Sequence, residues 1–138
     1  KTVSVHIPAG IDDGQTLRIK GEGEAGQRGS ASGDLLVRVR VQQDRRFERD
    51  GDDIRGTLSL KLIDAVLGAD VKADTVHGPV TMTIPAGTQP HQVLRIRGRG
   101  MPVVNSSRTG DHYVTVDIVV PVKLSREERR LWEELRKA

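Results

Sequence analysis

The sequence of 138 residues contains no cysteine, so these residues can form neither a disulfide nor a thiolate zinc site. It also contains no apolar run that approaches the roughly 18 residues of a membrane-spanning helix, and its first residues lack the pattern of a signal peptide. We therefore expect a soluble chain that is compatible with a reducing compartment.

Aromatic residues are almost absent, since the chain has one Trp, one Tyr and one Phe. The core must then be built from Val, Ile and Leu, and the β-branched residues among them favour strands. The 15 glycines and 6 prolines can supply the turns that many short strands need. The composition therefore predicts a mainly β fold.

An excess of one charge sign is also lacking, because 22 Lys and Arg are interleaved with 19 Asp and Glu. Such mixing is typical of a solvated surface. The most basic stretch holds Arg95, Arg97 and Arg99, whose alternation with apolar residues places them on the outer face of a strand. A basic β module that binds single-stranded nucleic acid is therefore the alternative function, although the stretch has none of the stacking aromatics that such modules use.

Motifs for catalysis are missing as well: the sequence has no P-loop and no nucleophile elbow. The four histidines lack metal-ligand spacing and are predicted to be surface or turn residues; they are His6, His77, His91 and His112. The acidic residues 50–53 predict a solvated turn between strands, because a calcium loop needs further ligands in alternation. We predict no enzyme activity and neither a cofactor nor a metal site in this chain.

What the sequence does contain is a repeat at a fixed offset of 77 residues. Residues 7–10, 17–19 and 33–34 recur at 84–87, 94–96 and 110–111. Over residues 5–41 the alignment needs no gap, and 15 of 37 positions are identical. Each copy predicts a strand, a Pro-Ala-Gly turn, a second strand, a glycine loop and a strand after Gly-Asp. We call residues 1–41 the first copy and residues 78–118 the second copy.

Two strands of the first copy follow from alternating apolar residues. Residues 3–7 alternate through Val3, Val5 and Ile7, and residues 37–41 alternate in the same way. The glycine loop at residues 21–26 reads Gly-x-Gly-x-x-Gly, as a dinucleotide site would. A turn-rich segment follows it instead of the helix N-terminus that holds a phosphate, so we predict a plain turn.

Residues 44–77 have no counterpart in the first copy, because residue 1 aligns with Gly78. They contain Phe47, an alternating run at 58–62 and a short helix candidate at 64–67. We therefore expect the chain to begin about halfway through its first repeat unit.

The C-terminus predicts a helix instead of a strand. Residues 125–128, Ser-Arg-Glu-Glu, form a capping box, and Leu124, Leu131, Trp132 and Leu135 follow as an apolar stripe at helical spacing. An isolated helix of this length is marginal in water, so the stripe needs a partner surface. For Trp132, docking on its own domain and contact with a second subunit both remain open.

Several ordered motifs resemble the C-terminal region of bacterial DnaJ-type J-domain co-chaperones. They are the two Ile-Pro-Ala-Gly segments, residues 10–26 with their Asp-Asp-Gly-Gln and glycine-loop residues, the segment Phe47-Glu-Arg-Asp-Gly-Asp-Asp-Ile54, and Ala65-Val-Leu-Gly68. The resemblance runs from residue 1 to about 135, in the order and spacing of the family.

The resemblance implies two tandem small β-sandwich domains followed by a helix. The first, at residues 1–43, is truncated at its N-terminus and follows the point where DnaJ carries an inserted zinc module. The second, at 44–123, holds the short helix, and residues 124–138 form a dimerisation helix. Zinc is possible in the parent protein outside these residues, whereas the family's His-Pro-Asp tripeptide is absent here.

By the same resemblance, the chain binds unfolded polypeptide in a cytoplasmic stress-response co-chaperone. Clients pass to a DnaK-type chaperone, which contacts parts of the parent mostly outside this chain. The positions implied for client binding are Val3 and Val37, with Leu17 and Ile19 as weaker candidates that plain core packing also explains. Homodimerisation is expected through the helix residues Leu131, Trp132 and Leu135, and we expect no membrane or nucleic-acid partner.

Overall fold

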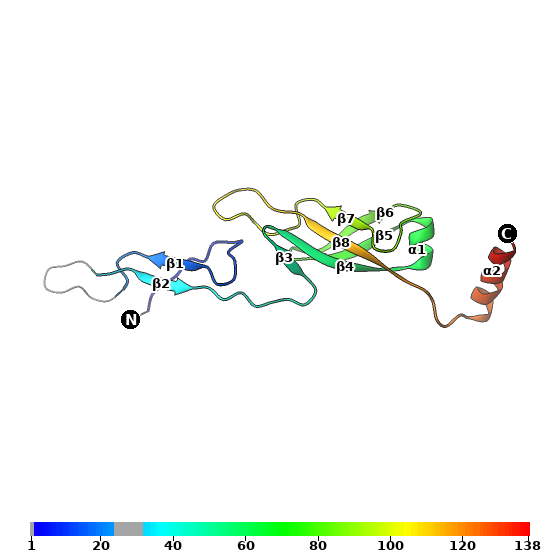
Figure 1. Ribbon diagram of the computed structural model, residues 1–138, viewed down its shortest axis with the longest axis horizontal. Helices are drawn as coiled ribbons and strands as arrows, with labels where there is room; N and C mark the ends of the chain where they lie inside the picture. The colour runs from blue at the N-terminus through cyan, green and yellow to red at the C-terminus, as the bar shows by residue number, and fades with distance from the viewer. Residues whose placement is uncertain (1, 24–31) are drawn as a thin grey trace. The chain divides into compact units, whose positions relative to one another are not determined.

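The computed structural model describes residues 2–23 and 32–138, in which the fold is mainly β, as the sequence predicted (Figure 1). The strands are β1 (Thr16–Ile19), β2 (Leu35–Arg38), β3 (Glu48–Asp50), β4 (Asp53–Lys61), β5 (Ala69–Thr75), β6 (Gly78–Ile84), β7 (Val93–Ile96) and β8 (His112–Val119). The helices are α1 (Leu62–Leu67) and α2 (Arg126–Lys137). The three residues Glu24 to Gly26 of the glycine loop, and the turn-rich segment predicted after them up to residue 31, lie outside the described residues.

The strands form one four-stranded sheet, in the order β3-β4-β8-β7, and two antiparallel pairs, β1-β2 and β5-β6 (Figure 1). The acidic residues 50–53 make the tight connection between β3 and β4, with Gly51 at a φ of 62°. A solvated turn between strands was the prediction for these residues, and it is confirmed.

The chain divides into two compact units, Lys1–Arg55 with Arg97–His112, and Gly56–Ile96 with Tyr113–Ala138. The main core lies in the second unit and contains Leu58, Leu60, Ala65, Ala73, Ile84, Val114 and Val116. Burial alternates along β4, as the apolar alternation there predicted, since Leu58 and Leu60 are 8% and 2% exposed. The domain boundaries inferred by resemblance stay predictions.

The repeat is structural as well as sequential. In the first copy the Gly21 amide donates to Asp34 Oδ1 at 3.3 Å, and in the second the Gly98 amide donates to Asp111 Oδ1 at 2.8 Å. The next glycine of each loop donates to the carbonyl of the glycine before that aspartate, at 2.8 Å in both copies. The shared glycines therefore serve a turn that the following Gly-Asp closes.

The predicted strand at residues 3–7 is wrong, because residues 2–8 belong to no strand. Its counterpart in the second copy is β6, which pairs along its whole length with β5. The residues of this chain supply no equivalent of β5 for the first copy, so the alternating residues have no partner strand. The strand β2 ends at Arg38, short of the predicted 41, and pairs with β1 alone among the described residues, whereas its counterpart β8 lies between β4 and β7.

Both predicted helices are present. The α1 helix starts at Leu62, two residues before the predicted start, and ends at Leu67. The capping box of α2 is confirmed: the Glu128 amide donates to Ser125 Oγ at 3.1 Å and the Ser125 amide donates to Glu128 Oε1 at 3.2 Å.

Candidate functional site

One face of the β1-β2 pair collects apolar residues that the sequence only partly singled out. The antiparallel register sets Leu17 opposite Val37 and Ile19 opposite Leu35, and all four side chains are half-buried. We call these four residues the β1-β2 apolar face. Leu35 was missed by sequence reasoning, although its place two residues before Val37 put it on the same side of the strand.

The other face of the pair is open to solvent. Leu36 lies between Leu35 and Val37 in sequence, points to the opposite side and is 62% exposed. Val3 is half-buried but lies in residues 2–8, outside both strands. The structure therefore brings three of the four predicted client-binding residues together and leaves Val3 apart from their strands.

The equivalent face in the second copy is core. Leu94 and Ile96 of β7 pack against the buried cluster, and Val114, the counterpart of Val37, is only 2% exposed. Their cover comes from β4, α1, β5 and β6, and the first three of these lie within residues 44–77, which have no counterpart in the first copy. Val114 and His112 are therefore more buried than their counterparts Val37 and Leu35. Leu94 and Ile96 are half-buried, as Leu17 and Ile19 are.

The β1-β2 pair also offers strand edges. Each of its strands has a single partner among the described residues, so the outer edge of each carries backbone groups without a neighbouring strand. An extended peptide can add to such an edge through main-chain hydrogen bonds while apolar side chains enter an adjacent pocket. The combination of edge and apolar face suits a sequence-tolerant peptide site.

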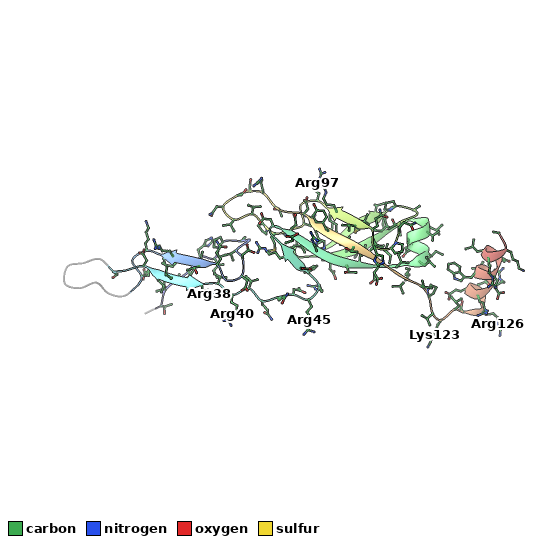
Figure 2. All side chains as sticks on the ribbon, in the orientation of Figure 1. Arg38, Arg40, Arg45, Arg97, Lys123 and Arg126 are labelled. Atoms are coloured by element: carbon green, nitrogen blue, oxygen red, sulfur yellow. The ribbon has the colours of Figure 1, made fainter. Side chains whose placement is uncertain are left out.

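Basic residues lie near this pair and on β7. Arg38, Arg40 and Arg45 are exposed and follow one another from the end of β2 (Figure 2). Arg95 and Arg97 are exposed beside half-buried Leu94 and Ile96, as the alternation predicted. Nucleic-acid binding stays a prediction, and it would appear as an affinity that falls steeply with salt.

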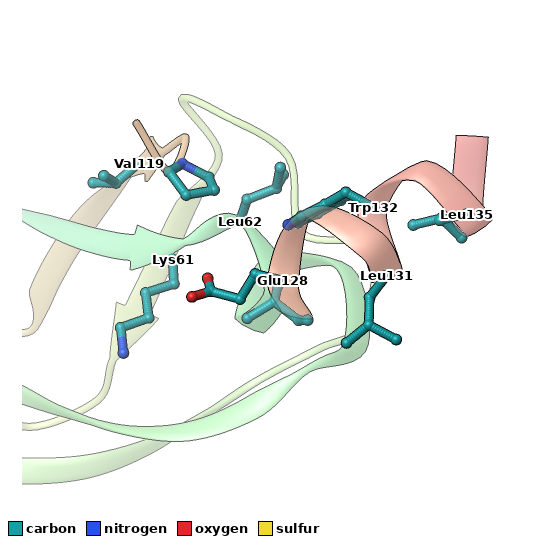
Figure 3. Close-up of a pocket in the computed structure, with 9 residues that line it drawn as sticks. Lys61, Leu62, Val119, Glu128, Leu131, Trp132 and Leu135 are labelled. Carbon is teal, nitrogen blue, oxygen red and sulfur yellow. The ribbon is translucent and has the colours of Figure 1, made fainter. Parts of the chain in front are cut away.

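The helix α2 lines a cavity of about 490 Å³ with other residues of the second unit (Figure 3). The lining residues are Lys61, Leu62, Ile63, Val119, Pro121, Glu128, Leu131, Trp132 and Leu135. Trp132 is half-buried and lies on the side of the helix that faces Leu62, whereas Leu131 and Leu135 remain 50% and 62% exposed. The three residues predicted for dimerisation therefore share one cavity, and two of them keep accessible apolar surface.

His112 is not the surface or turn residue that the sequence predicted. It is fully buried at the start of β8, with its ring edge-on to Phe47 at a centroid distance of 5.5 Å. Neither ring nitrogen has a hydrogen-bond partner, and burial lowers the pKa of His112 below its usual value. The signal was available in the repeat, because the aligned residue of the first copy is Leu35.

Within residues 2–23 and 32–138, no three His, Asp or Glu side chains come together as a metal site would require. None of the helices in the described part of the chain combines the length and the apolar character needed to cross a bilayer.

Comparison with known sequences identifies the family of this chain. The sequence model of the DnaJ C-terminal domain matches residues 1–121, which is most of the chain. The chain belongs to the DnaJ C-terminal domain family. The resemblance that the ordered motifs predicted is thereby confirmed.

Individual relatives agree. The chain is 46% identical over 138 residues to the chaperone protein DnaJ of Nostoc punctiforme, 44% over 138 residues to that of Gloeobacter violaceus and 47% over 134 residues to that of Bacillus cytotoxicus. These alignments cover 99%, 99% and 97% of the chain but only 36% or 37% of each relative. The chain therefore spans about a third of the length of these relatives, all of which are named as chaperones.

Proposed function

We propose that this chain is a client-binding and dimerisation region of a DnaJ-type co-chaperone. The observation that supports it most directly is the half-buried β1-β2 apolar face, in which Val37 is accessible although its counterpart in the second copy, Val114, is only 2% exposed. Membership of the DnaJ family supplies the class of ligand, which is unfolded or non-native polypeptide.

The mechanism needs no catalytic group. A client in extended conformation would add to an edge of the β1-β2 pair, and its backbone hydrogen bonds would give affinity without sequence preference. A bulky client side chain would then be desolvated against Leu17, Ile19 and Val37, at roughly 25 cal/mol per Å² of apolar surface removed from water. The site would therefore bind client segments rich in apolar residues, and these are the segments that the client buries in its native fold.

Delivery of the client to a DnaK-type chaperone and assembly into a homodimer complete the proposal. Both rest on the family, and the dimer rests also on the accessible apolar surface of Leu131 and Leu135 beside the α2 cavity. Two chains joined in this way would present two β1-β2 apolar faces to one client.

Adjacent residues of β2 provide a matched test of the client site. Val37→Asp, alone and combined with Val3→Asp, places a carboxylate at the predicted site, while Leu36→Asp places the same group on the exposed side of the same strand. Suppression of the aggregation of a chemically denatured client, followed by light scattering, should fall for the Val37 variants and stay near wild type for Leu36→Asp.

Amide exchange or circular dichroism must show that the β1-β2 pair still forms in each variant. Equal protection by wild type and a folded Val37→Asp variant would contradict the site. Equal loss in Val37→Asp and Leu36→Asp would mean that the strand pair matters but that its apolar face does not.

A further inference from the structure

We propose that Arg49 is a positioning residue that braces the first copy on the β3-β4 hairpin, so that the β1-β2 apolar face is presented in one fixed orientation. This inference rests on the proposed client-binding function. The brace joins the turn at residues 9–14 to Arg49 and Gly51 of the hairpin, and all of these residues lie in the first unit.

The guanidinium of Arg49 has partners on both elements. Its Nη2 donates to the carbonyl oxygen of Gly10 at 2.5 Å, its Nη1 to that of Ile11 at 2.9 Å, and its Nε to that of Gly51 at 2.7 Å. The Nε also lies 2.9 Å from a carboxylate oxygen of Asp12. The side chain is only 21% exposed, so these contacts are partly shielded from water.

Only arginine offers this set of donors in one plane. Its fork can address two successive carbonyls and a third acceptor together, whereas the ammonium of lysine is a compact charge that cannot span them. A substitution would also leave two backbone carbonyls of a partly buried turn without their donor, and unsatisfied acceptors are costly.

A second, independent contact shows that the turn is docked. A Cβ built on Gly10 would lie 1.8 Å from the carbonyl oxygen of Pro102, so the backbone approaches residues 97–112 as closely as only glycine permits. Gly87 holds the same place in the second copy, and a Cβ there would meet nothing within 4 Å. Ile11, which follows Gly10 in the turn of the first copy, is 7% exposed.

The turn at residues 9–14 is also joined to the β1-β2 pair by hydrogen bonds. The Gly14 amide donates to the Val39 carbonyl at 2.7 Å, and the Val39 amide donates to the Gln15 carbonyl at 2.8 Å. The Val41 amide donates to Asp13 Oδ1 at 2.8 Å. Whatever fixes the turn therefore also fixes β1 and the end of β2.

A fixed orientation of the face matters for the affinity of a client. Ordering a mobile site on binding costs affinity, and a β1-β2 apolar face that the brace already holds within the first unit avoids that cost. Loss of the brace would therefore weaken client binding without removing any apolar residue of the face.

The structural arm compares Arg49→Met and Arg49→Lys with Arg55→Met. Arg55 lies on the same hairpin and makes only an exposed ion pair with Asp50, which makes it a matched control. In both Arg49 variants, amide exchange at residues 12–15 should accelerate by about tenfold or more, since the turn opens more often.

Spin labels at Thr16→Cys and Ser107→Cys, introduced into the cysteine-free chain, report the placement of β1 within the first unit. Their distance distribution should be narrow in the wild type and in Arg55→Met, and broad in the Arg49 variants.

The binding arm measures the Kd of an apolar heptapeptide. For Arg49→Met the Kd should rise by about threefold or more, because the face must then be ordered on binding, whereas for Arg55→Met it should stay within about twofold.

Unchanged exchange and an unchanged distance distribution in Arg49→Met would overturn the brace. An unchanged Kd of the peptide in Arg49→Met, or equal weakening in Arg49→Met and Arg55→Met, would overturn its positioning role. If the wild type does not bind the peptide, the proposed client function fails, and exchange and distance still decide whether Arg49 braces the turn.

Discussion

At the scale of single residues, identical positions of the repeat have different surroundings. Gly10 and Gly87 both sit at positive φ, 88° and 81°, where any L side chain is strained. Only Gly10 also has a backbone carbonyl where a Cβ would stand. The alignment identifies the turn in both copies, but the close approach depends on residues far away in the sequence, and no local pattern encodes it.

Alanine substitution separates the strain of the positive φ from the close approach of the Pro102 carbonyl. Gly87→Ala should cost about 1–2 kcal/mol of unfolding free energy from backbone strain alone. Gly10→Ala should cost a further 1–3 kcal/mol or so, because the methyl group must displace the Pro102 carbonyl. Urea unfolding with a common m-value measures both. Equal losses in the two variants would mean that the first turn is not docked in solution.

At the scale of elements, a pattern whose contacts are local predicted the structure better than one that needs a distant partner. The capping box of α2 is written in four consecutive residues and appears as predicted, because its hydrogen bonds are made within one turn. The alternation at residues 3–7 is equally clear, yet no strand forms there, since a strand needs a partner and β5 has no counterpart for the first copy. Periodicity shows which face a strand would bury, and the presence of a partner strand decides whether the strand forms.

The same helix carries a prediction about assembly. Leu131→Asp with Leu135→Asp, or removal of residues 125–138, should convert a dimer into a monomer, because charge on the apolar stripe opposes its burial. Lys137→Asp, at the end of the same helix, is the control and should leave the dimer intact. Light scattering coupled to size exclusion gives the mass. A wild-type mass of one chain, or a dimer that survives the deletion, would refute dimerisation through α2.

At the scale of the whole molecule, one buried side chain should link folding to pH. His112 is enclosed without a hydrogen-bond partner, and its pKa in the folded state is lowered by burial. The unfolded chain therefore takes up a proton near the usual pKa of about 6.5, while the folded chain resists it. The contribution of this residue to stability is present above that pH and is lost as pH falls toward the lowered pKa.

The free energy of unfolding should accordingly decline below about pH 6.5, by at most about 1.4 kcal/mol per pH unit for this one group. His112→Leu, which installs the residue type of the first copy at the aligned position, should remove that part of the slope. Denaturant titrations between pH 4 and 8 measure it. Identical slopes in the two proteins would show that His112 does not titrate with folding.

The sequence by itself determined the mainly β class, the duplicated unit, the two helices and the family. Composition, turns, caps and repeats can be recognised within short segments or by comparing the sequence with itself. The apolar face on β1 and β2 was foreseen in three of its four residues for the same reason. Only the tertiary structure decided that Val114 is buried while Val37 is half-buried, that His112 is buried, and that Arg49 holds a turn 38 residues away. Burial, pairing and docking depend on which distant segments are present to make contact, and the order of residues along one segment does not carry that information.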